Sequence, residues 1–81
     1  METLRKESGR RVVGARSVLR AIRAGKLSRV YVCSDADTFL YQQVVRSAEE
    51  AGLPCVRVSS MKELGAACGV EVPTAAAGLL R

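Results

Sequence analysis

The fold class is decided by the stretch Arg29-Val30-Tyr31-Val32-Cys33-Ser34-Asp35-Ala36-Asp37, because it contains a strand and the turn that leads into a helix. Arg29 to Cys33 is rich in β-branched and aromatic side chains, which favours a strand. Ser34 to Asp37 is typical of a turn, and Asp37 can accept hydrogen bonds from the first free N–H groups of a following helix. That helix is predicted from Thr38 to Ala51. Its inward face is expected to carry Leu40, Val44, Ala48 and Ala51.

Extended and helical segments also alternate on the amino-terminal side of this stretch. Arg10 to Val13 predicts a short strand. From Ala15 to Ala24 apolar residues recur at helical spacing, and Gly25 is typical of the position just after a helix end. This pattern predicts a helix with one buried stripe. The polar residues 1–9 are expected to form a short helix of their own.

The carboxyl-terminal side repeats the alternation. Cys55 to Val58 alternates as a strand does, and Ser60 with Glu63 fits a capping box, which predicts another helix start. Ala75 to Leu80 is an apolar run of strand length, although its alanines also suit a helix. Because no linker or repeat interrupts the pattern, residues 1–81 are expected to form a single α/β domain.

The positive charge of the chain is concentrated near its beginning. Nine of the thirteen basic residues lie in the first 29 positions, from Arg5 to Arg29, and Glu2 and Glu7 are the only acids among those positions. The rest of the chain has four basic and six acidic residues. Such a lopsided charge creates a local positive field that attracts polyanions. RNA, DNA and anionic lipid are therefore the first partners to consider.

The composition argues against an enzyme and against a membrane protein. The chain has no His and no Trp, so the usual general base and a common zinc ligand are missing. No apolar run approaches the roughly 20 residues that a membrane-spanning helix needs. Cys33, Cys55 and Cys68 are widely spaced and are expected to be buried free thiols, which fits a reducing, cytoplasmic compartment. No cofactor or metal is expected.

Two acidic residues leave a phosphate-handling enzyme open as a minor alternative. Asp35 and Asp37 form a D-x-D pair of the kind that can hold Mg²⁺ together with substrate phosphates. In a turn between a strand and a helix, however, Asp is most simply a helix cap. Tyr31 and Tyr41 offer rings on which bases can stack, but one strand tyrosine and one helix tyrosine more often serve packing.

A row of arginines lies beside the buried stripe of the first predicted main helix. Arg16, Arg20 and Arg23 point within about 40° of one direction on that helix. Gly14 precedes the helix, whose free N–H groups and positive dipole end attract phosphate. A guanidinium pairs with O6 and N7 of guanine or with two phosphate oxygens, which favours nucleic acid. The alternative is an ordinary solvated helix face.

The late loop carries apolar side chains where connecting segments normally have polar ones. These are Val70, Val72 and Pro73. An extruded base or a protein partner can lie against such residues. Alternatively, Val70 and Val72 turn inward and belong to the core.

Three segments together resemble the kink-turn RNA-binding ribosomal-protein family, that of large-subunit proteins seven-Ae and thirty-e, and most of all its short bacterial members. They are Gly14-Ala15-Arg16-Ser17-Val18-Leu19-Arg20, Val30-Tyr31-Val32-Cys33-Ser34-Asp35-Ala36-Asp37 and Leu64-Gly65-Ala66-Ala67-Cys68-Gly69-Val70-Glu71-Val72. The likeness extends from about Arg11 to Leu80. Its most specific feature is the order L-G-x-A-x-G followed by an apolar loop.

The resemblance implies a three-layer α/β/α sandwich around a four-stranded mixed sheet, with RNA bound where a helix start meets the late loop. In the family, Asn-Glu and a Lys three residues further on address guanines of tandem sheared G·A pairs. Arg16, Ser17 and Arg20 occupy those positions here, and the short Ser17 is the main departure. The loop would pack on the extruded base. The RNA-binding residues implied are Gly14, Ala15, Arg16, Ser17, Arg20, Val70, Glu71, Val72 and Pro73.

The leading hypothesis is therefore a non-catalytic, monomeric protein that recognises a kink-turn or similar bulged RNA with sheared G·A pairs. Ribosomal RNA and a structured mRNA leader are the candidate targets, and the ribosome is a candidate partner. Specificity at bulges and splayed bases fits the general rule that the major groove of regular A-form RNA is inaccessible. The second hypothesis is a ribosome-associated adaptor that binds protein and lacks specific RNA recognition.

Overall fold

The computed structural model describes residues 10–81, and this part of the chain alternates strand and helix from end to end. The elements are β1 (Arg11–Val13), α2 (Ala15–Arg23), β2 (Leu27–Cys33), α3 (Thr38–Glu50), β3 (Cys55–Val58), α4 (Met61–Ala67) and β4 (Ala76–Leu80). The short helix predicted over residues 1–9 lies outside the described residues. Among residues 10–81, no helix has the length and apolar character needed to cross a bilayer.

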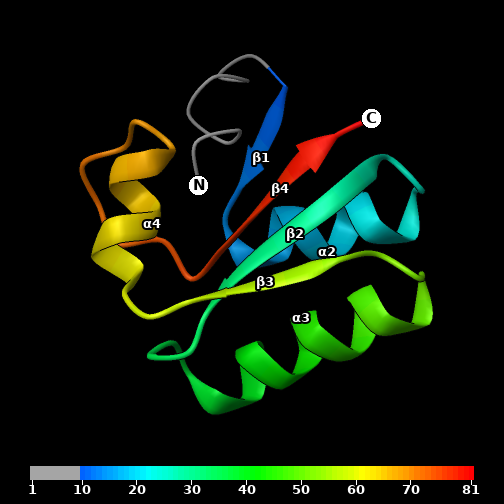
Figure 1. Ribbon diagram of the computed structural model, residues 1–81, viewed down its shortest axis with the longest axis horizontal. Helices are drawn as coiled ribbons and strands as arrows, with labels where there is room; N and C mark the ends of the chain where they lie inside the picture. Colours follow the sequence, from blue (N-terminus) through cyan, green and yellow to red (C-terminus); the bar gives the residue numbers. More distant parts are fainter. Residues whose placement is uncertain (1–9) are drawn as a thin grey trace.

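The four strands form one mixed sheet in the order β1-β4-β2-β3 (Figure 1). β4 is antiparallel to both β1 and β2, and β2 is parallel to β3. β1, β2 and β3 therefore run in the same direction and finish at the same end of the sheet. We call this the carboxyl end of the sheet. β4, α2, α3 and α4 begin there.

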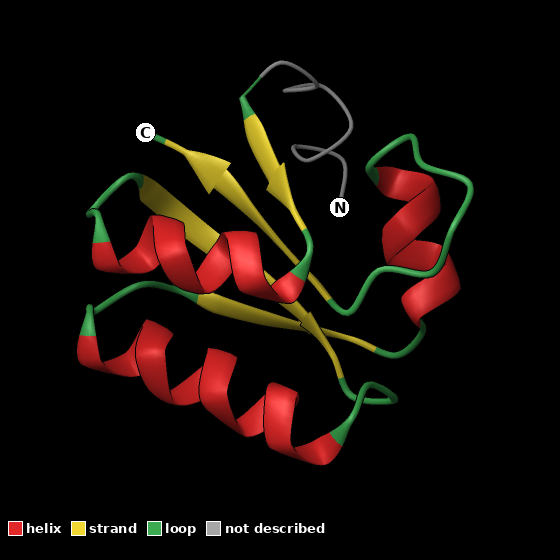
Figure 2. Cartoon of the chain, turned by 180° about the vertical axis from the view of Figure 1, so that it is seen from behind, coloured by secondary structure: helices red, strands yellow, loops and turns green. Residues whose placement is uncertain are grey.

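Helices cover both faces of the sheet, so the expected three-layer sandwich is confirmed. α2 and α3 lie side by side on one face, and α4 covers the other (Figure 2). Val30 and Val32 of β2 belong to the core cluster under α2 and α3. Tyr31 and Cys33 alternate with them and belong to the cluster under α4. A strand buried on both faces needs such a continuous apolar run, which is what β2 carries.

Side-chain oxygens cap the starts of α3 and α4. Asp37 Oδ1 accepts a hydrogen bond from the Leu40 N–H at 3.2 Å. Ser60 Oγ accepts from the N–H groups of Lys62 and Glu63, at 3.2 and 3.3 Å. These bonds satisfy donors that have no partner within the helix. The predicted caps of both helices are confirmed.

The structure differs from the sequence-based prediction in two places. β2 begins at Leu27 rather than Arg29, because Leu27 and Arg29 both pair with β4 across an irregular register. Ala51, expected to face inward, is exposed as the C-cap residue of α3. The inward face of α3 instead rests on Val44 and Ala48, which are buried, and on Leu40, which is half-buried.

The alanine-rich segment Ala76–Leu80 is a central strand and not a helix. Its small residues let neighbouring groups approach closely. A Cβ placed on Gly78 would lie 2.7 Å from a methyl carbon of Leu27, so the Leu27 side chain occupies that space. Ala76 and Ala77 are fully buried, one toward each helical layer.

Candidate functional site

The start of α2 and the beginning of β4 are joined at the carboxyl end of the sheet. The Gly14 N–H donates to the carbonyl oxygen of Ala76 at 2.8 Å. Gly14 has a φ of 101°, a backbone conformation that favours glycine at this turn. The loop of residues 70–73 leads into Ala76 within a few residues. Both halves of the predicted RNA-binding site therefore lie at the same end of the molecule (Figure 2).

The first turn of α2 differs from the starts of α3 and α4. Gly14 supplies no side-chain cap, and the first turn contains no acidic residue. Arg16, Ser17 and Arg20 are exposed, whereas Ala15 is half-buried against the core. Uncapped N–H groups and the positive dipole end of α2 are thus flanked by guanidinium groups. This combination favours an anion or a hydrogen-bond acceptor.

The loop after α4 presents one large apolar side chain to solvent. Val72 is 65% exposed, and Glu71 and Pro73 beside it are exposed as well. Val70 is half-buried and packs against the core cluster under α4. The interpretation that both valines turn inward is therefore right for Val70 and wrong for Val72. An exposed valine next to a proline gives this loop an apolar tip.

Close packing against α4 holds the loop in position. A Cβ on Gly65 would lie 2.3 Å from the carbonyl oxygen of Val72, so only glycine permits this approach. The Thr74 hydroxyl donates to the same oxygen at 3.4 Å, and the Thr74 N–H donates to the carbonyl of Met61 at 3.0 Å. The guanidinium of Arg11 donates to the carbonyl of Cys68. The loop conformation is thus set by its own helix and by β1.

Two shallow hollows adjoin the predicted residues. One, of about 300 Å³, lies between α4 and the loop, where Lys62 and Ala66 face residues 70–73. The other, of about 280 Å³, lies along the flank of α2 and has Val12 and Leu80 in its lining with Ser17 and Arg20. Lys62 and Val12 could not be identified from the sequence, because only the tertiary structure brings them to these residues.

The acidic pair serves the architecture of the two neighbouring helices. Asp37 caps α3, and Asp35 reaches across to α4, where its carboxylate accepts from the Met61 N–H at 3.1 Å. Tyr31 is buried in the core, and Tyr41 is half-buried with its ring centroid 6.0 Å from the guanidinium carbon of Arg57. All four side chains therefore have structural partners, as the simpler interpretation of each predicted.

All three cysteines are free thiols, as predicted; Cys33 and Cys68 are buried, whereas Cys55 is half-buried and not buried as expected. Burial, together with the smaller effect of the nearby Asp35 carboxylate, raises the pKa of Cys33 to about 11. Burial also raises the pKa of Cys55 and of Cys68, against the smaller opposing effects of Arg57 and Arg11. A thiol with a raised pKa is a poor nucleophile at neutral pH. The cysteines therefore act as core residues.

The chain is similar to bacterial proteins that carry the name RNA-binding protein. One from Geobacillus thermodenitrificans is 40% identical over 75 residues, which are 93% of this chain and 92% of the relative. RNA-binding protein YbxF of Geobacillus stearothermophilus is 39% identical over the same shares of the two chains.

A solved structure has the same fold. The 15.5kD RNA binding protein of Giardia lamblia superimposes with a TM-score of 0.86 at 28% identity, covering 96% of this chain and 68% of that one. The sequence itself matches the family of ribosomal proteins L7Ae and L30e, the seven-Ae and thirty-e proteins named above, over residues 1–81. The chain belongs to the ribosomal protein L7Ae/L30e/S12e/Gadd45 family.

Proposed function

We propose that this protein is a non-catalytic RNA-binding protein that recognises a kink-turn or a similar bulged RNA with sheared G·A pairs. It acts as one domain, as a cytoplasmic monomer, on ribosomal RNA or on a structured mRNA leader. The observation that carries the proposal is the hydrogen bond from Gly14 to Ala76, which joins the arginine-flanked start of α2 to the segment that follows the apolar loop. The names of the relatives support RNA as the ligand.

The start of α2 supplies the polar half of this interface. The Arg16 guanidinium can donate two parallel hydrogen bonds to O6 and N7 of a guanine, and the first-turn N–H groups can meet a phosphate. Ser17 has only a short hydroxyl where the family has Glu or Gln. The base-reading role therefore falls mainly on Arg16 and Arg20, both of which are exposed.

The loop supplies the apolar half of the interface. An unpaired base that leaves the helical stack needs a surface that replaces its lost stacking. Val72 and Pro73 offer such a surface, and the close contact with Gly65 holds the loop backbone against α4 while these side chains stay exposed. A bent RNA presents its G·A pairs and its extruded base close together. The two halves of the site fit these two features.

The test is a titration of the protein with a kink-turn RNA and with the same RNA in which Watson–Crick pairs replace the G·A pairs. We expect the intact kink-turn to bind at least ten-fold more tightly, since each lost base contact costs about 1–3 kcal/mol. Equal affinity for the two RNAs would reject specific recognition. Failure to retain either RNA at physiological salt would favour a protein-binding adaptor instead.

A further inference from the structure

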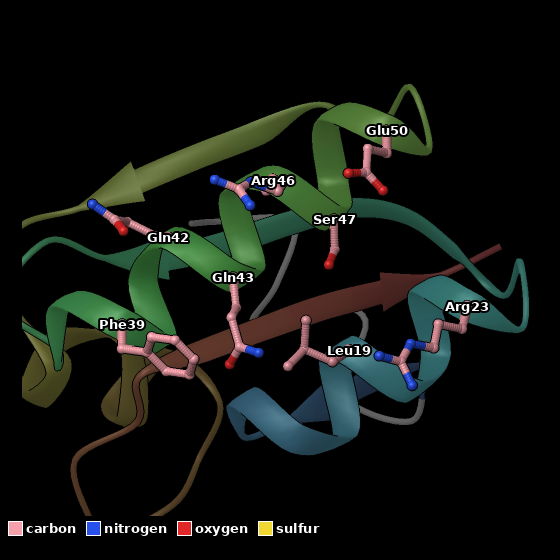
Figure 3. Close-up of a pocket in the computed structure, with 8 residues that line it drawn as sticks. All are labelled: Leu19, Arg23, Phe39, Gln42, Gln43, Arg46, Ser47 and Glu50. Atoms are coloured by element: carbon pink, nitrogen blue, oxygen red, sulfur yellow. The ribbon is translucent and has the colours of Figure 1, made fainter.

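The outer surface of the two-helix layer contains a groove that the proposed site does not use. It runs between α2 and α3 and has a volume of about 220 Å³ (Figure 3). The lining residues are Leu19, Arg23, Phe39, Gln42, Gln43, Arg46, Ser47 and Glu50. Because α2 and α3 both begin at the carboxyl end of the sheet, one end of this groove opens toward the proposed RNA site.

Phe39 is the residue of this groove that most clearly indicates a binding surface. It is the second residue of α3, and its side chain is 68% exposed, which is unusual for so large an apolar group. In Figure 3 the Phe39 ring and the Gln43 amide both point toward Leu19 of α2. An exposed aromatic ring beside an apolar side chain offers a surface on which a planar group can stack.

Polar groups surround the ring in a pattern that suits a nucleotide. Arg23 from α2 and Arg46 from α3 bring two positive charges to the groove, against the single carboxylate of Glu50. Gln42 and Gln43 carry amide groups that can donate to and accept from the edge of a base. Proteins bind single-stranded RNA by stacking its bases on aromatic rings and by placing positive charges near its phosphate backbone.

The same composition disfavours a protein partner. A stable protein interface requires a contiguous apolar core from which charged residues are largely absent. Here Phe39 and Leu19 are the apolar members of a lining that is otherwise polar or charged. A single ring among arginines and glutamines supplies too little apolar area for such a core. An unpaired base with its phosphate needs only one aromatic ring for stacking and a nearby positive charge.

We propose that the α2–α3 groove binds an unpaired nucleotide that flanks the folded RNA element, with its base stacked on Phe39 and its phosphate near Arg23 or Arg46. This inference rests on the proposed function, because the RNA must first be placed at the start of α2. It extends the RNA contact from the carboxyl end of the sheet onto the outer face of the helical layer.

The first experiment compares a kink-turn RNA that ends flush with RNAs that carry three unpaired adenosines at the 5′ or at the 3′ end. We expect one of the tails to raise affinity roughly five- to 100-fold, the range for one stacked base. The Phe39→Ala variant should lose this gain and bind the flush RNA as the unaltered protein does. The Val56→Ala variant, altered at an exposed apolar residue of β3, serves as the control and should keep the gain.

A second experiment detects the stacking directly. The chain contains no Trp, so the Phe39→Trp variant has a single indole, located in the groove. The tailed RNA should quench its fluorescence and the flush RNA should not, while a Val56→Trp variant should show no difference between them. A tail that changes neither affinity nor fluorescence would overturn the proposal. So would a blue shift that grows with protein concentration in the absence of RNA, because a second copy of the chain would then fill the groove.

The two proposals fail in different ways. Loss of the G·A dependence with the tail effect retained would reject kink-turn recognition and leave the groove assignment standing. Loss of the tail effect with the G·A dependence retained would reject the groove alone.

Discussion

Gly65 shows how one residue of α4 determines the shape of a loop several positions away. Its missing side chain leaves room for the carbonyl oxygen of Val72, and the Thr74 hydroxyl bonds to the same oxygen. The exposure of Val72 follows from this contact, because the backbone of the loop is held against α4 while the side chain points outward. A glycine inside a seven-residue helix costs helix stability, so its presence indicates a packing requirement.

The Gly65→Ala substitution tests this requirement. The new methyl group would meet the Val72 carbonyl at 2.3 Å, and the backbone must shift. We expect the free energy of unfolding to fall by about 1–3 kcal/mol in urea denaturation, the usual cost of overpacking. RNA affinity should fall as well, because the loop moves.

The control for this substitution lies on the same helix. Ala66 is exposed, so Ala66→Ser should change stability by no more than about 0.5 kcal/mol. If Gly65→Ala proved as stable as the unaltered protein, the close contact would have no energetic role.

At the level of elements, α2 combines a core face with the side that we propose contacts RNA. Val18, Ala21 and Ile22 are buried, while Arg16 and Arg20 are exposed on the same nine-residue helix. Because the buried residues lie on one face and the exposed arginines on another, the arginines can be replaced without disturbing the core. The same helix separates two hollows, one along β1 and one along α3.

Substitution of Arg16 separates base recognition from phosphate attraction. If Arg16 contacts a guanine, Arg16→Ala should cost about 1–3 kcal/mol with the kink-turn RNA and leave the slope of log affinity against log salt nearly unchanged. A phosphate contact would instead flatten that slope by about one unit. The Arg29→Ala variant removes an equal charge near the start of β2, at the opposite end of the sheet, and should have little effect.

On the scale of the whole molecule, the sheet topology gathers the starts of α2, α3 and α4 at one end. Cys33, the last residue of β2, connects the segments that meet there. Its thiol lies 3.2 Å from the carbonyl oxygen of Thr74 and 3.4 Å from that of Ser60, and donates to both. The residue is fully buried, so a thiolate at this position would lose both hydration and these two bonds.

This burial predicts a loss of stability at alkaline pH. The pKa of Cys33 is raised in the folded protein from its ordinary value of 9.0 to about 11. The unfolded chain therefore releases the proton first, and the stabilising contribution is complete below pH 9 and is lost as the pH rises toward 11. The expected loss is on the order of 2 kcal/mol for this residue.

Urea denaturation at several values from pH 8 to pH 10.5 measures this effect. The Cys33→Ser variant keeps a donor at the same place but does not titrate in this range, so its stability should fall less steeply. Identical pH dependence of the two proteins would show that Cys33 makes no contribution. Cys55 and Cys68 stay in both proteins, so their own raised pKa values cancel in the comparison.

Apart from the last segment, which suited a strand or a helix, the order and type of the described elements were predictable from local signals. Apolar spacing, glycine after a helix, and capping residues such as Asp37 and Ser60 act within a few positions, so the sequence shows them directly. The end of β2 and the start of α3 follow from such signals. The beginning of β2 does not, because Leu27 joins the strand through pairing with β4.

The candidate site was predictable in part. Gly14, Arg16 and the loop of residues 70–73 were identified from charge, apolar character and family resemblance, and the structure places them at one end of the sheet. Phe39 is the one phenylalanine of the sequence, and no sequence pattern marked it as part of a site. Its role in a groove depends on the approach of α2, which no pattern within α3 reveals.

Local chemistry thus determined where most helices and strands form, where the positive charge lies and which residues are candidates for RNA contact. Contacts between residues far apart in the chain decided the rest. They made an alanine-rich run a central strand, turned Val70 inward and Val72 outward, and opened a groove between α2 and α3. The physical reason is that exposure and close packing depend on which segments become neighbours, and that is known only once the chain has folded.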